Sequence, residues 1–279
     1  MEVIGIIPAR WGSSRFPGKP LAMIGGKPMI ERVYEQARKA LERVVVATDD
    51  SRIYDCVTGF GGLAVMTRED HRCGTERCLE AYEKMKNGCE SPWYEALHGL
   101  RDEEIIVVNI QGDEPFIQPE QIRLLCGLWG MDNRNDGVRG KSAGGCAMSE
   151  TEIGTLVKPY HTTDTWEMLV NPNTPKVVFS ESDGRAILFS RSVIPYMRGI
   201  PQDEWLAKGR YYGHIGMYAY RGDVLRRIVS MPMSRLEQAE SLEQLRWLEN
   251  GIQIRVAVSE QWSVGIDTPE DLERIEREK

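Results

Sequence analysis

The first half of the chain alternates short apolar runs with segments of helical periodicity. The apolar runs predict strands at residues 3–8, 43–48, 63–67 and 105–110, and the periodic segments predict helices at 28–41, 51–60, 74–86 and 119–128. Hydrophobicity within the strands is continuous rather than alternating, which indicates burial on both faces. The pattern therefore predicts repeated βαβ units around a parallel sheet covered by helices.

From about residue 150 this alternation becomes less regular. Apolar segments at 155–158, 175–180, 186–190 and 214–220 predict further strands, and Ser182-Asp-Gly-Arg185 predicts a hairpin turn. A helix at 236–250, a strand at 252–258 and a helix at 269–278 complete the pattern. We expect one Rossmann-like α/β domain over residues 1–279, with a mostly parallel central sheet, an antiparallel lobe at about 150–220 and surface insertions at 87–103 and 130–145.

Polar segments follow three of the predicted strands. They are 9–20, 49–50 together with 68–77, and 111–115. Because ligands of open parallel sheets bind at the carboxyl ends of the strands, these segments are expected to line one crevice. The first carries Arg10, Arg15 and Lys19 among glycines, prolines and serines, a composition that suits phosphate binding. An ordinary βα turn with solvated basic residues is the alternative interpretation.

Composition narrows the classes of protein. With 279 residues, 41% of them hydrophobic, the chain can bury a sizeable core. No apolar run approaches the roughly 18 residues of a membrane span, and Pro8 and Arg10 come too early for a signal peptide, so we expect a cytoplasmic protein without membrane insertion. A net charge of −7 argues against nucleic-acid binding, and scattered cysteines and histidines argue against a zinc site or a disulfide framework.

Two common phosphate-binding motifs do not fit the first loop. Walker A requires G-x-x-x-x-G-K-[ST], whereas five residues separate Gly12 from Gly18, and Lys19 is followed by Pro20. The dinucleotide motif G-x-G-x-x-G is absent after the first predicted strand. The sequence therefore argues against a P-loop kinase and against a dehydrogenase.

The sequence resembles the nucleotidyltransferases that couple sugars to nucleoside triphosphates, and within them the 3-deoxy-manno-octulosonate (Kdo) cytidylyltransferases. The resemblance runs from end to end of the chain. It is carried by Ile7-Pro-Ala-Arg10, Ser14-Arg-Phe-Pro-Gly-Lys-Pro-Leu21, Gly26-Lys-Pro-Met-Ile30, Val46-Ala-Thr-Asp49, Met66-Thr-Arg68, His71-Arg-Cys-Gly-Thr-Glu-Arg77, Asn109-Ile-Gln-Gly-Asp-Glu-Pro115, Phe189-Ser-Arg191, His214-Ile-Gly-Met-Tyr218, Leu242-Glu-Gln-Leu-Arg246 and Gly265-Ile-Asp-Thr-Pro-Glu-Asp-Leu272.

The resemblance implies a reaction and a set of residues for it. The anomeric hydroxyl of Kdo would attack the α-phosphorus of CTP and release pyrophosphate, without a covalent enzyme intermediate, for lipopolysaccharide synthesis. Catalysis would rest on Lys19, Arg15 and Asp113. The residues implied for CTP are Pro8, Ala9, Arg10, Ser14, Arg15, Lys19, Arg72, Gly74, Thr75, Arg77 and Gln111.

The remaining implied partners are a metal ion, the sugar and a second copy of the chain. Asp113 and Asp267 would hold Mg²⁺, which takes carboxylate and phosphate oxygens. The residues implied for the acidic eight-carbon sugar are Gln111, Arg191, His214, Tyr218 and Glu237. Of these, Arg191 suits the sugar carboxylate because a guanidinium binds a carboxylate bidentately. The lobe at 150–220 would make a homodimer contact.

Local patterns alone leave other interpretations open. Asp267 fits the N-cap of the last helix, Gly74 and Thr75 fit a helix entry, His214 fits a structural histidine of a strand, and a surface glutamate such as Glu237 is usually solvated. Gln238 stands where the resemblance predicts a histidine-containing segment, so an 8-amino analogue of Kdo is an alternative substrate. A sialate-activating enzyme and a non-catalytic nucleotide sensor are further alternatives.

Overall fold

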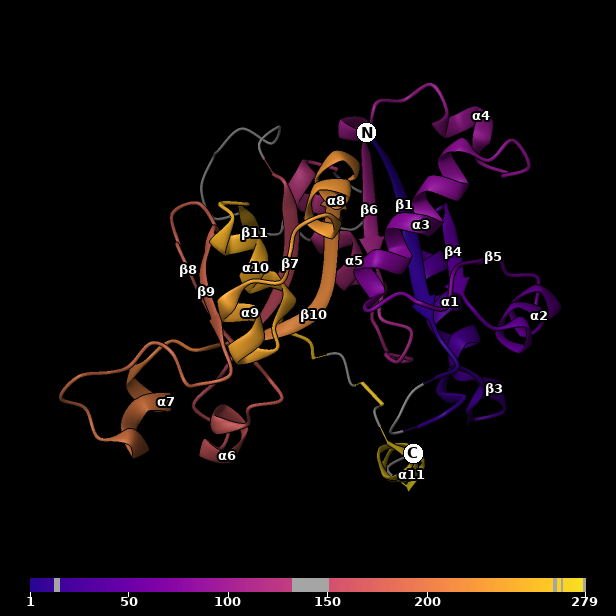
Figure 1. Cartoon of the computed structure of the whole chain (residues 1–279). Helices are drawn as coiled ribbons and strands as arrows, with labels where there is room; N and C mark the ends of the chain where they lie inside the picture. The colour runs from indigo at the N-terminus through magenta and orange to yellow at the C-terminus, as the bar shows by residue number, and fades with distance from the viewer. Residues whose placement is uncertain (13–15, 132–150, 263–264, 267, 278–279) are drawn as a thin grey trace. The chain divides into compact units, whose positions relative to one another are not determined.

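The structure is a computed structural model, and it describes residues 1–12, 16–131, 151–262, 265–266 and 268–277 (Figure 1). Contacts between residues divide the chain into two compact units. The first comprises Met1–Arg123, Ala219–Val229 and Ser263–Lys279, and the second comprises Leu124–Tyr218 and Ser230–Trp262. The prediction of a single domain with a lobe at 150–220 stays a prediction, since the contacts group residues differently.

The first unit is built on four parallel strands. Their order is β6 (Ile105–Asn109), β1 (Glu2–Ala9), β4 (Val44–Thr48) and β5 (Ala64–Met66). Every residue of β4 and β6 is buried, as the continuous apolar runs predict. Since β1 pairs with a strand on each side, its carboxyl end lies in the middle of the sheet edge where ligands of this architecture bind.

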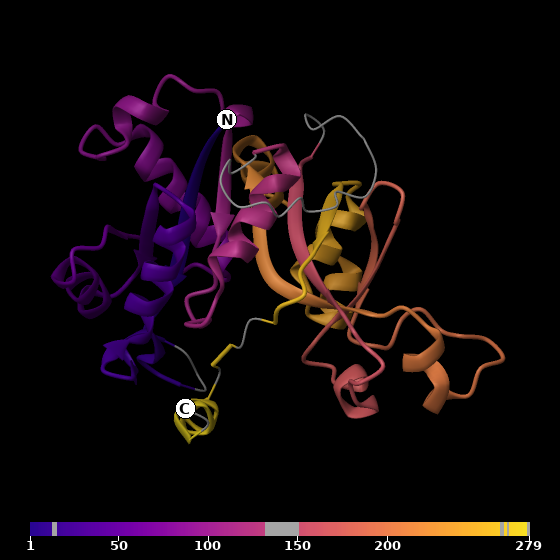
Figure 2. The same cartoon turned by 180° about the vertical axis from the view of Figure 1, so that it is seen from behind.

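Helices connect these strands and cover the sheet. The chain passes through α1 (Met29–Ala40) and α2 (Ser51–Gly59) in one direction along the sheet and returns through α3 (Gly74–Asn87). Right-handed crossovers therefore place α3 on the opposite face from α1 and α2, as Figure 1 and the reverse view in Figure 2 show. The other elements of this unit are η1 (Lys19–Leu21), β2 (Met23–Ile24), β3 (Lys27–Pro28), α4 (Tyr94–Leu97), η2 (Asp102–Glu104), α8 (Gly222–Val229) and α11 (Pro269–Arg277).

Asp102 joins three elements of the first unit. Its carboxylate lies 2.5 Å from the Tyr82 hydroxyl and 2.7 Å from Arg226 Nε, and it also accepts from Lys86 Nζ. Burial raises the pKa of this carboxyl, but the hydrogen bonds from these three side chains outweigh it and lower the pKa to about 2. Asp102 thereby fixes α3 and α8 against η2.

The second unit combines parallel and antiparallel pairing. Strand β11 (Ile254–Val258) runs parallel to β7 (Ile153–Pro159), whereas β8 (Lys176–Phe179) is antiparallel to β9 (Ala186–Ser190) and to β10 (Tyr212–Arg221). The predicted hairpin between β8 and β9 is confirmed. The other elements here are α6 (Trp166–Val170), η5 (Gln202–Glu204) and α7 (Trp205–Lys208), while α5 (Pro119–Cys126) and η3 (Gly127–Trp129) lead in from the first unit.

The predicted helix at 236–250 is wrong in one respect, because the structure divides it in two. Helix α9 (Arg235–Glu240) ends at Ser241, which has φ 50° in the left-handed region, and α10 (Glu243–Glu249) begins two residues later. The Arg191 guanidinium hydrogen-bonds the carbonyl oxygens of Glu240 and Ser241. These contacts satisfy carbonyls at the end of α9, so the helix stops there despite its continuous periodicity.

The fold class agrees with the prediction: α/β, with mostly parallel strands and an antiparallel set. The segment 87–103, expected as a surface insertion, includes α4 and the start of η2. Residues 132–145 of the second expected insertion lie outside the described residues. Within the described part of the chain, no helix is long and apolar enough to cross a bilayer.

Candidate nucleotide-binding site

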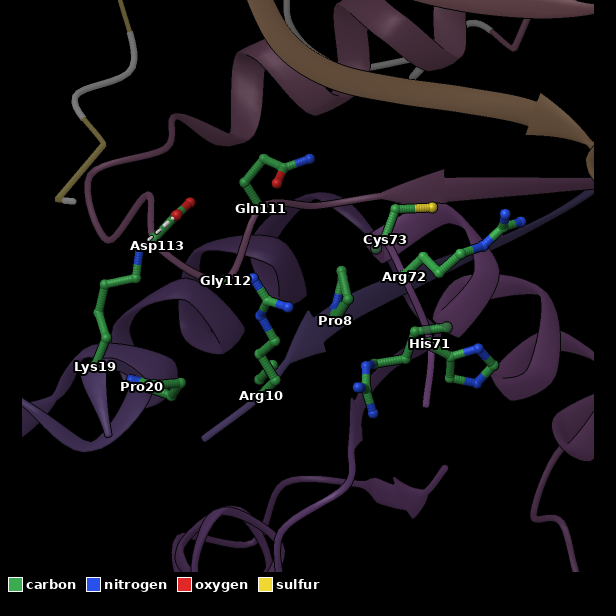
Figure 3. Close-up of a pocket in the computed structure, with 13 residues that line it drawn as sticks. Pro8, Arg10, Lys19, Pro20, His71, Arg72, Cys73, Gln111, Gly112 and Asp113 are labelled. Carbon is green, nitrogen blue, oxygen red and sulfur yellow. Dashed lines mark hydrogen bonds and ion pairs between the residues drawn. The ribbon is translucent and has the colours of Figure 1, made fainter. Parts of the chain in front are cut away.

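A cavity of about 250 Å³ opens at the carboxyl ends of β1 and β6, beside the beginning of α3 (Figure 3). Its walls come from the three polar segments that were predicted to line one crevice. The lining residues are Pro8, Ala9, Arg10, Lys19, Pro20, His71, Arg72, Cys73, Gly74, Arg77, Gln111, Gly112 and Asp113. The lining residues of the second and third segments are more than 50 positions from those of the first, so the parallel sheet brings them together.

Two glycines allow the walls of the cavity to approach β1. A Cβ added to Gly112 would lie 2.8 Å from the Pro8 carbonyl oxygen, and one added to Gly74 would lie 3.3 Å from Pro8 Cγ. The first distance is shorter than real Cβ contacts, and its partner is backbone. Glycine at 112 is therefore required for the close approach of the 111–113 turn to the end of β1.

The basic loop turns sharply before it reaches the cavity. Gly18 has φ 70°, its N–H donates to the Trp11 carbonyl, and an added Cβ would lie 2.8 Å from the Trp11 ring. The Arg52 guanidinium lies 3.3 Å from the centre of the same ring, which places a cation over the aromatic face. This turn delivers Lys19 to the cavity. Ser14 and Arg15, two predicted phosphate ligands, lie outside the described residues.

Lys19 and Asp113 meet across the cavity. Lys19 Nζ lies 2.6 Å from Asp113 Oδ2, and the two side chains are 13% and 32% exposed (Figure 3). Ninety-four positions separate them in the sequence. A cation and a carboxylate in contact at a partly open site present one group for phosphate oxygens and one for a hard cation. Arg10, also in the lining, is exposed and adds positive charge.

The fit of these groups to Mg²⁺ is favourable. Among the described residues, no three acidic, histidine or cysteine side chains gather as a metal cage. Mg²⁺ needs no such cage, since it is commonly held by one or two carboxylates together with waters and phosphate oxygens. Asp113 supplies one carboxylate, and the carbonyl of Asp113 accepts a 2.9 Å hydrogen bond from Ile266 N. Asp267, the second predicted ligand, lies outside the described residues.

The wall from α3 differs from the prediction in detail. The helix begins at Gly74 with Cys73 at its N-cap position, so Thr75 is a buried residue of the first turn and does not cap the helix. Arg77 lines the cavity, but its guanidinium donates to Asp49 at 2.7 Å and to Thr67 Oγ1 at 2.6 Å. Arg77 therefore supports the wall through contacts within the protein.

Arg191, the predicted carboxylate ligand, lies in the second unit and is already extensively bonded. Its Nε donates to the Glu240 carbonyl at 2.6 Å and its Nη1 to the Pro172 carbonyl at 2.7 Å. Buried Lys176 holds the neighbouring turn through the carbonyls of Asn171 and Thr174, and burial lowers its pKa. Two cations therefore surround this turn.

Glu240, on α9, supports the same region. Its carboxylate accepts from Ser190 Oγ and from Arg191 N, both at 2.7 Å. Glu237, three residues earlier, is also buried: it forms a capping box with Ser234 and lies 3.4 Å from Arg246 Nε. The alternative interpretation of Glu237 as a solvated surface residue is wrong, because α9 packs this side chain inward. The sequence signal for a shared role of Glu237 and Glu240 was their spacing, which places them on one side of the helix.

His214 lies on β10 next to Tyr218. Burial lowers the pKa of His214 to about 3, so the imidazole is neutral near pH 7. Its Nε2 is 3.0 Å from Thr155 Oγ1, whose hydroxyl donates to the Met217 carbonyl at 2.9 Å. Thr155 oxygen therefore accepts from Nε2–H, which leaves Nδ1 as an acceptor. No sequence signal pointed to Thr155, because a threonine within an apolar strand is usually a packing residue.

A mostly parallel α/β unit with a basic loop at the end of its first strand and an acidic turn at the end of another is the architecture of a nucleotidyltransferase. The cytidylyltransferase family model matches residues 4–254, and the chain belongs to this family.

Comparison with individual proteins narrows the relationship. The chain is 50% identical to the 3-deoxy-manno-octulosonate cytidylyltransferase of Parabacteroides distasonis, over 98% of this chain and 96% of the relative. It is 45% identical to the protein of the same name from Thermodesulfovibrio yellowstonii, over 99% and 98%. A solved CMP-2-keto-3-deoxy-manno-octonic acid synthetase in complex with CTP superimposes with a TM-score of 0.78 at 38% identity, covering 99% of this chain and 98% of that one. The predicted resemblance to Kdo cytidylyltransferases is confirmed.

Proposed function

We propose that this protein transfers CMP from CTP to Kdo, forming CMP-Kdo and pyrophosphate. The observation that carries the proposal is the Lys19–Asp113 pair within a cavity at the strand ends, in a chain 50% identical over nearly its full length to a protein named for this reaction. The product would be the activated sugar used in lipopolysaccharide synthesis, and the cytoplasm would be the site of the reaction.

The chemistry requires positioning and charge neutralisation. The anomeric oxygen of Kdo forms a bond to the α-phosphorus of CTP, the bond from that phosphorus to the bridging oxygen breaks, and pyrophosphate leaves with the negative charge. Lys19, with Arg10 and Arg15, would neutralise the triphosphate, and the backbone of the 71–74 segment would contact the base. Such preorganised charges act mainly on the transition state.

Magnesium dependence is part of the proposal. Asp113 and Asp267 would hold Mg²⁺, which when bound would neutralise charge on the triphosphate. Support comes from the position of Asp113 in the cavity and from the hydrogen bond between Ile266 N and the Asp113 carbonyl, since Ile266 precedes Asp267. We expect Asp113→Asn to reduce turnover at saturating CTP by at least about 100-fold.

Arg191, His214, Tyr218 and Glu237 of the second unit would bind the sugar. Support comes from the positive charge around Arg191: Lys176 lies within electrostatic reach of both Arg191 and Glu240, and the Glu240 carboxylate accepts from the Arg191 backbone N–H. The carboxylate of a sugar acid would balance this positive charge. His214 Nδ1 is an acceptor suited to a sugar hydroxyl.

We further propose a homodimer formed through the second unit. Apolar side chains are exposed along β9 and beyond it: Ile187 is 56%, Leu188 38% and Tyr196 73% exposed. Light scattering of the purified protein should give twice the monomer mass, and Ile187→Asp should lower the measured mass toward that of one monomer. A monomer at micromolar concentration would contradict this part of the proposal.

A pyrophosphate-release assay tests the activity itself. The protein is incubated with CTP, Mg²⁺ and, separately, Kdo, 8-amino-Kdo and a sialic acid. Fastest release with Kdo supports the proposal, and release only with another sugar acid replaces the substrate but keeps the reaction class. CTP binding without release from any octulosonate rejects the enzyme and favours the nucleotide sensor. Omission of Mg²⁺ and its replacement by EDTA test the metal requirement.

A further inference from the structure

The segment between β5 and α3 forms one wall of the nucleotide cavity and has little regular structure of its own. His71, Arg72 and Cys73 line the cavity (Figure 3), yet residues 67–73 belong to neither a strand nor a helix. Side-chain contacts therefore supplement the backbone hydrogen bond from Thr67 N to the Thr48 carbonyl in holding this segment. The helix that follows supplies them.

Glu80, in the second turn of α3, holds two points of the segment. Its Oε2 accepts from Arg68 N at 3.0 Å and lies 2.5 Å from His71 Nε2, while Oε1 lies 2.7 Å from Lys84 Nζ. Burial raises the pKa of Glu80, but these hydrogen bonds outweigh it and lower the pKa to about 2. The carboxylate is therefore ionised near pH 7 and accepts only, so His71 Nε2 carries the proton that it donates.

The same helix contacts the segment at further points. Glu76 Oε2 accepts from Arg72 N at 2.8 Å, and Arg77 Nη1 donates to the Arg68 carbonyl at 3.2 Å. Among these contacts, only Glu80 holds two residues with one atom. Its Oε2 bonds both Arg68 and His71, which are three positions apart. Hydrogen bonds to a charged group are also the stronger kind.

We propose that Glu80 is a positioning residue for CTP. Glu80 fixes residues 68–71 against α3 and so holds the adjacent wall, residues 71–74, in the geometry that binds CTP, a role that rests on the proposed use of CTP. Glu80 is absent from the cavity lining and acts through Arg68 and His71. Without it, CTP would have to order the segment on binding, and affinity would fall by that entropic cost.

Three variants isolate this role. Glu80→Ala removes both acceptors, and Glu80→Gln keeps one amide oxygen for Arg68 N. Glu83→Ala is the matched control, since Glu83 is an acidic residue three positions further along the same helix and its carboxylate pairs with Arg226 of α8 rather than with the segment. The Glu80 side chain is 16% exposed and borders a second hollow with Arg68 and His71, so its truncation leaves no sealed apolar cavity. The variants should fold.

Three measurements on the intact protein test whether Glu80 positions the segment for CTP. Amide hydrogen exchange of the peptide containing 67–73, without ligand, reports how well the segment is held. Calorimetry gives the Kd for CTP, and pyrophosphate release gives kcat and KM. We expect Glu80→Ala to accelerate exchange and to raise Kd and KM for CTP about tenfold, while kcat stays within about threefold of the wild type. Glu80→Gln should give intermediate values, and Glu83→Ala should match the wild type.

Opposite outcomes overturn the inference. Unchanged exchange and unchanged Kd in Glu80→Ala would show that other contacts hold the segment. A fall in kcat equal to the fall in kcat/KM would show that Glu80 acts on the transition state rather than on CTP binding. A wild type that binds CTP without turnover would reject the proposed function, while the exchange and Kd comparisons would still decide the role of Glu80.

Discussion

Replacement of Lys19 by methionine separates a catalytic role from a structural one. Methionine keeps an unbranched side chain in a position that is 13% exposed, and it removes the positive charge. In the free protein Lys19 Nζ pairs with Asp113 Oδ2 at 2.6 Å, but with Asp113 32% exposed the pair contributes at most about 1 kcal/mol to stability. In the transition state the same charge would face the departing pyrophosphate.

The expected effects of Lys19→Met on turnover and on thermal stability therefore differ in size. Loss of one preorganised charge costs about 100- to 1000-fold in kcat, or about 3–4 kcal/mol. Loss of about 1 kcal/mol in stability lowers Tm by only about 2–4 °C in a protein of this size. We expect Lys19→Met to lose most of its kcat, measured by pyrophosphate release at saturating CTP and Kdo. Its Tm, measured by thermal unfolding, should fall only slightly.

Lys27→Met is the matched control. Lys27 belongs to the same basic N-terminal segment and forms ion pairs with Glu31 and Glu35, outside the cavity. It should retain wild-type turnover. A loss below about tenfold in Lys19→Met, or an equal loss in Lys27→Met, would refute the assignment of Lys19 to the leaving pyrophosphate.

Three further predictions concern stability, the cavity and the sugar. The pKa of Asp102 is lowered from 3.8 to about 2, so its contribution, about 1–2 kcal/mol after allowance for solvent screening, is present above pH 4 and lost as the pH falls toward 2. The urea midpoints of wild type and Asp102→Asn should therefore differ at pH 7 and approach each other as the pH falls from 4 toward 2; a constant difference would contradict this. Gly112→Ala should raise KM for CTP at least about fivefold, because its Cβ meets the Pro8 carbonyl at 2.8 Å, whereas Gly99→Ala, with open space around it, should not. Arg191→Lys should raise KM for Kdo about tenfold and leave KM for CTP unchanged, since one ammonium cannot replace the fork of donors; equal changes for both substrates would argue against a sugar-specific role.

Much of the fold could be predicted because its signals are local. The buried strands β4 and β6 are continuous apolar runs, and Asp50 before α2 is an N-cap whose side chain accepts from Arg52 N. The prediction failed where a distant contact overrides local periodicity. The 236–250 segment has an unbroken helical pattern, yet Arg191, about 50 residues away, binds the carbonyls at its interruption.

For the site, the kinds of chemical group and the strand ends at which they lie could be predicted from the sequence alone. The basic loop and the acidic turn are local segments, and the parallel sheet follows from the hydrophobic pattern, so a shared cavity could be predicted. Which of these groups contact one another became visible only in the folded protein. The contact of Lys19 with Asp113 and the hold of Glu80 on the 68–71 segment depend on side-chain directions set by packing. Such directions are not encoded in the spacing of residues along the chain, because carboxylates on one helix can face water or a neighbouring loop with the same local pattern.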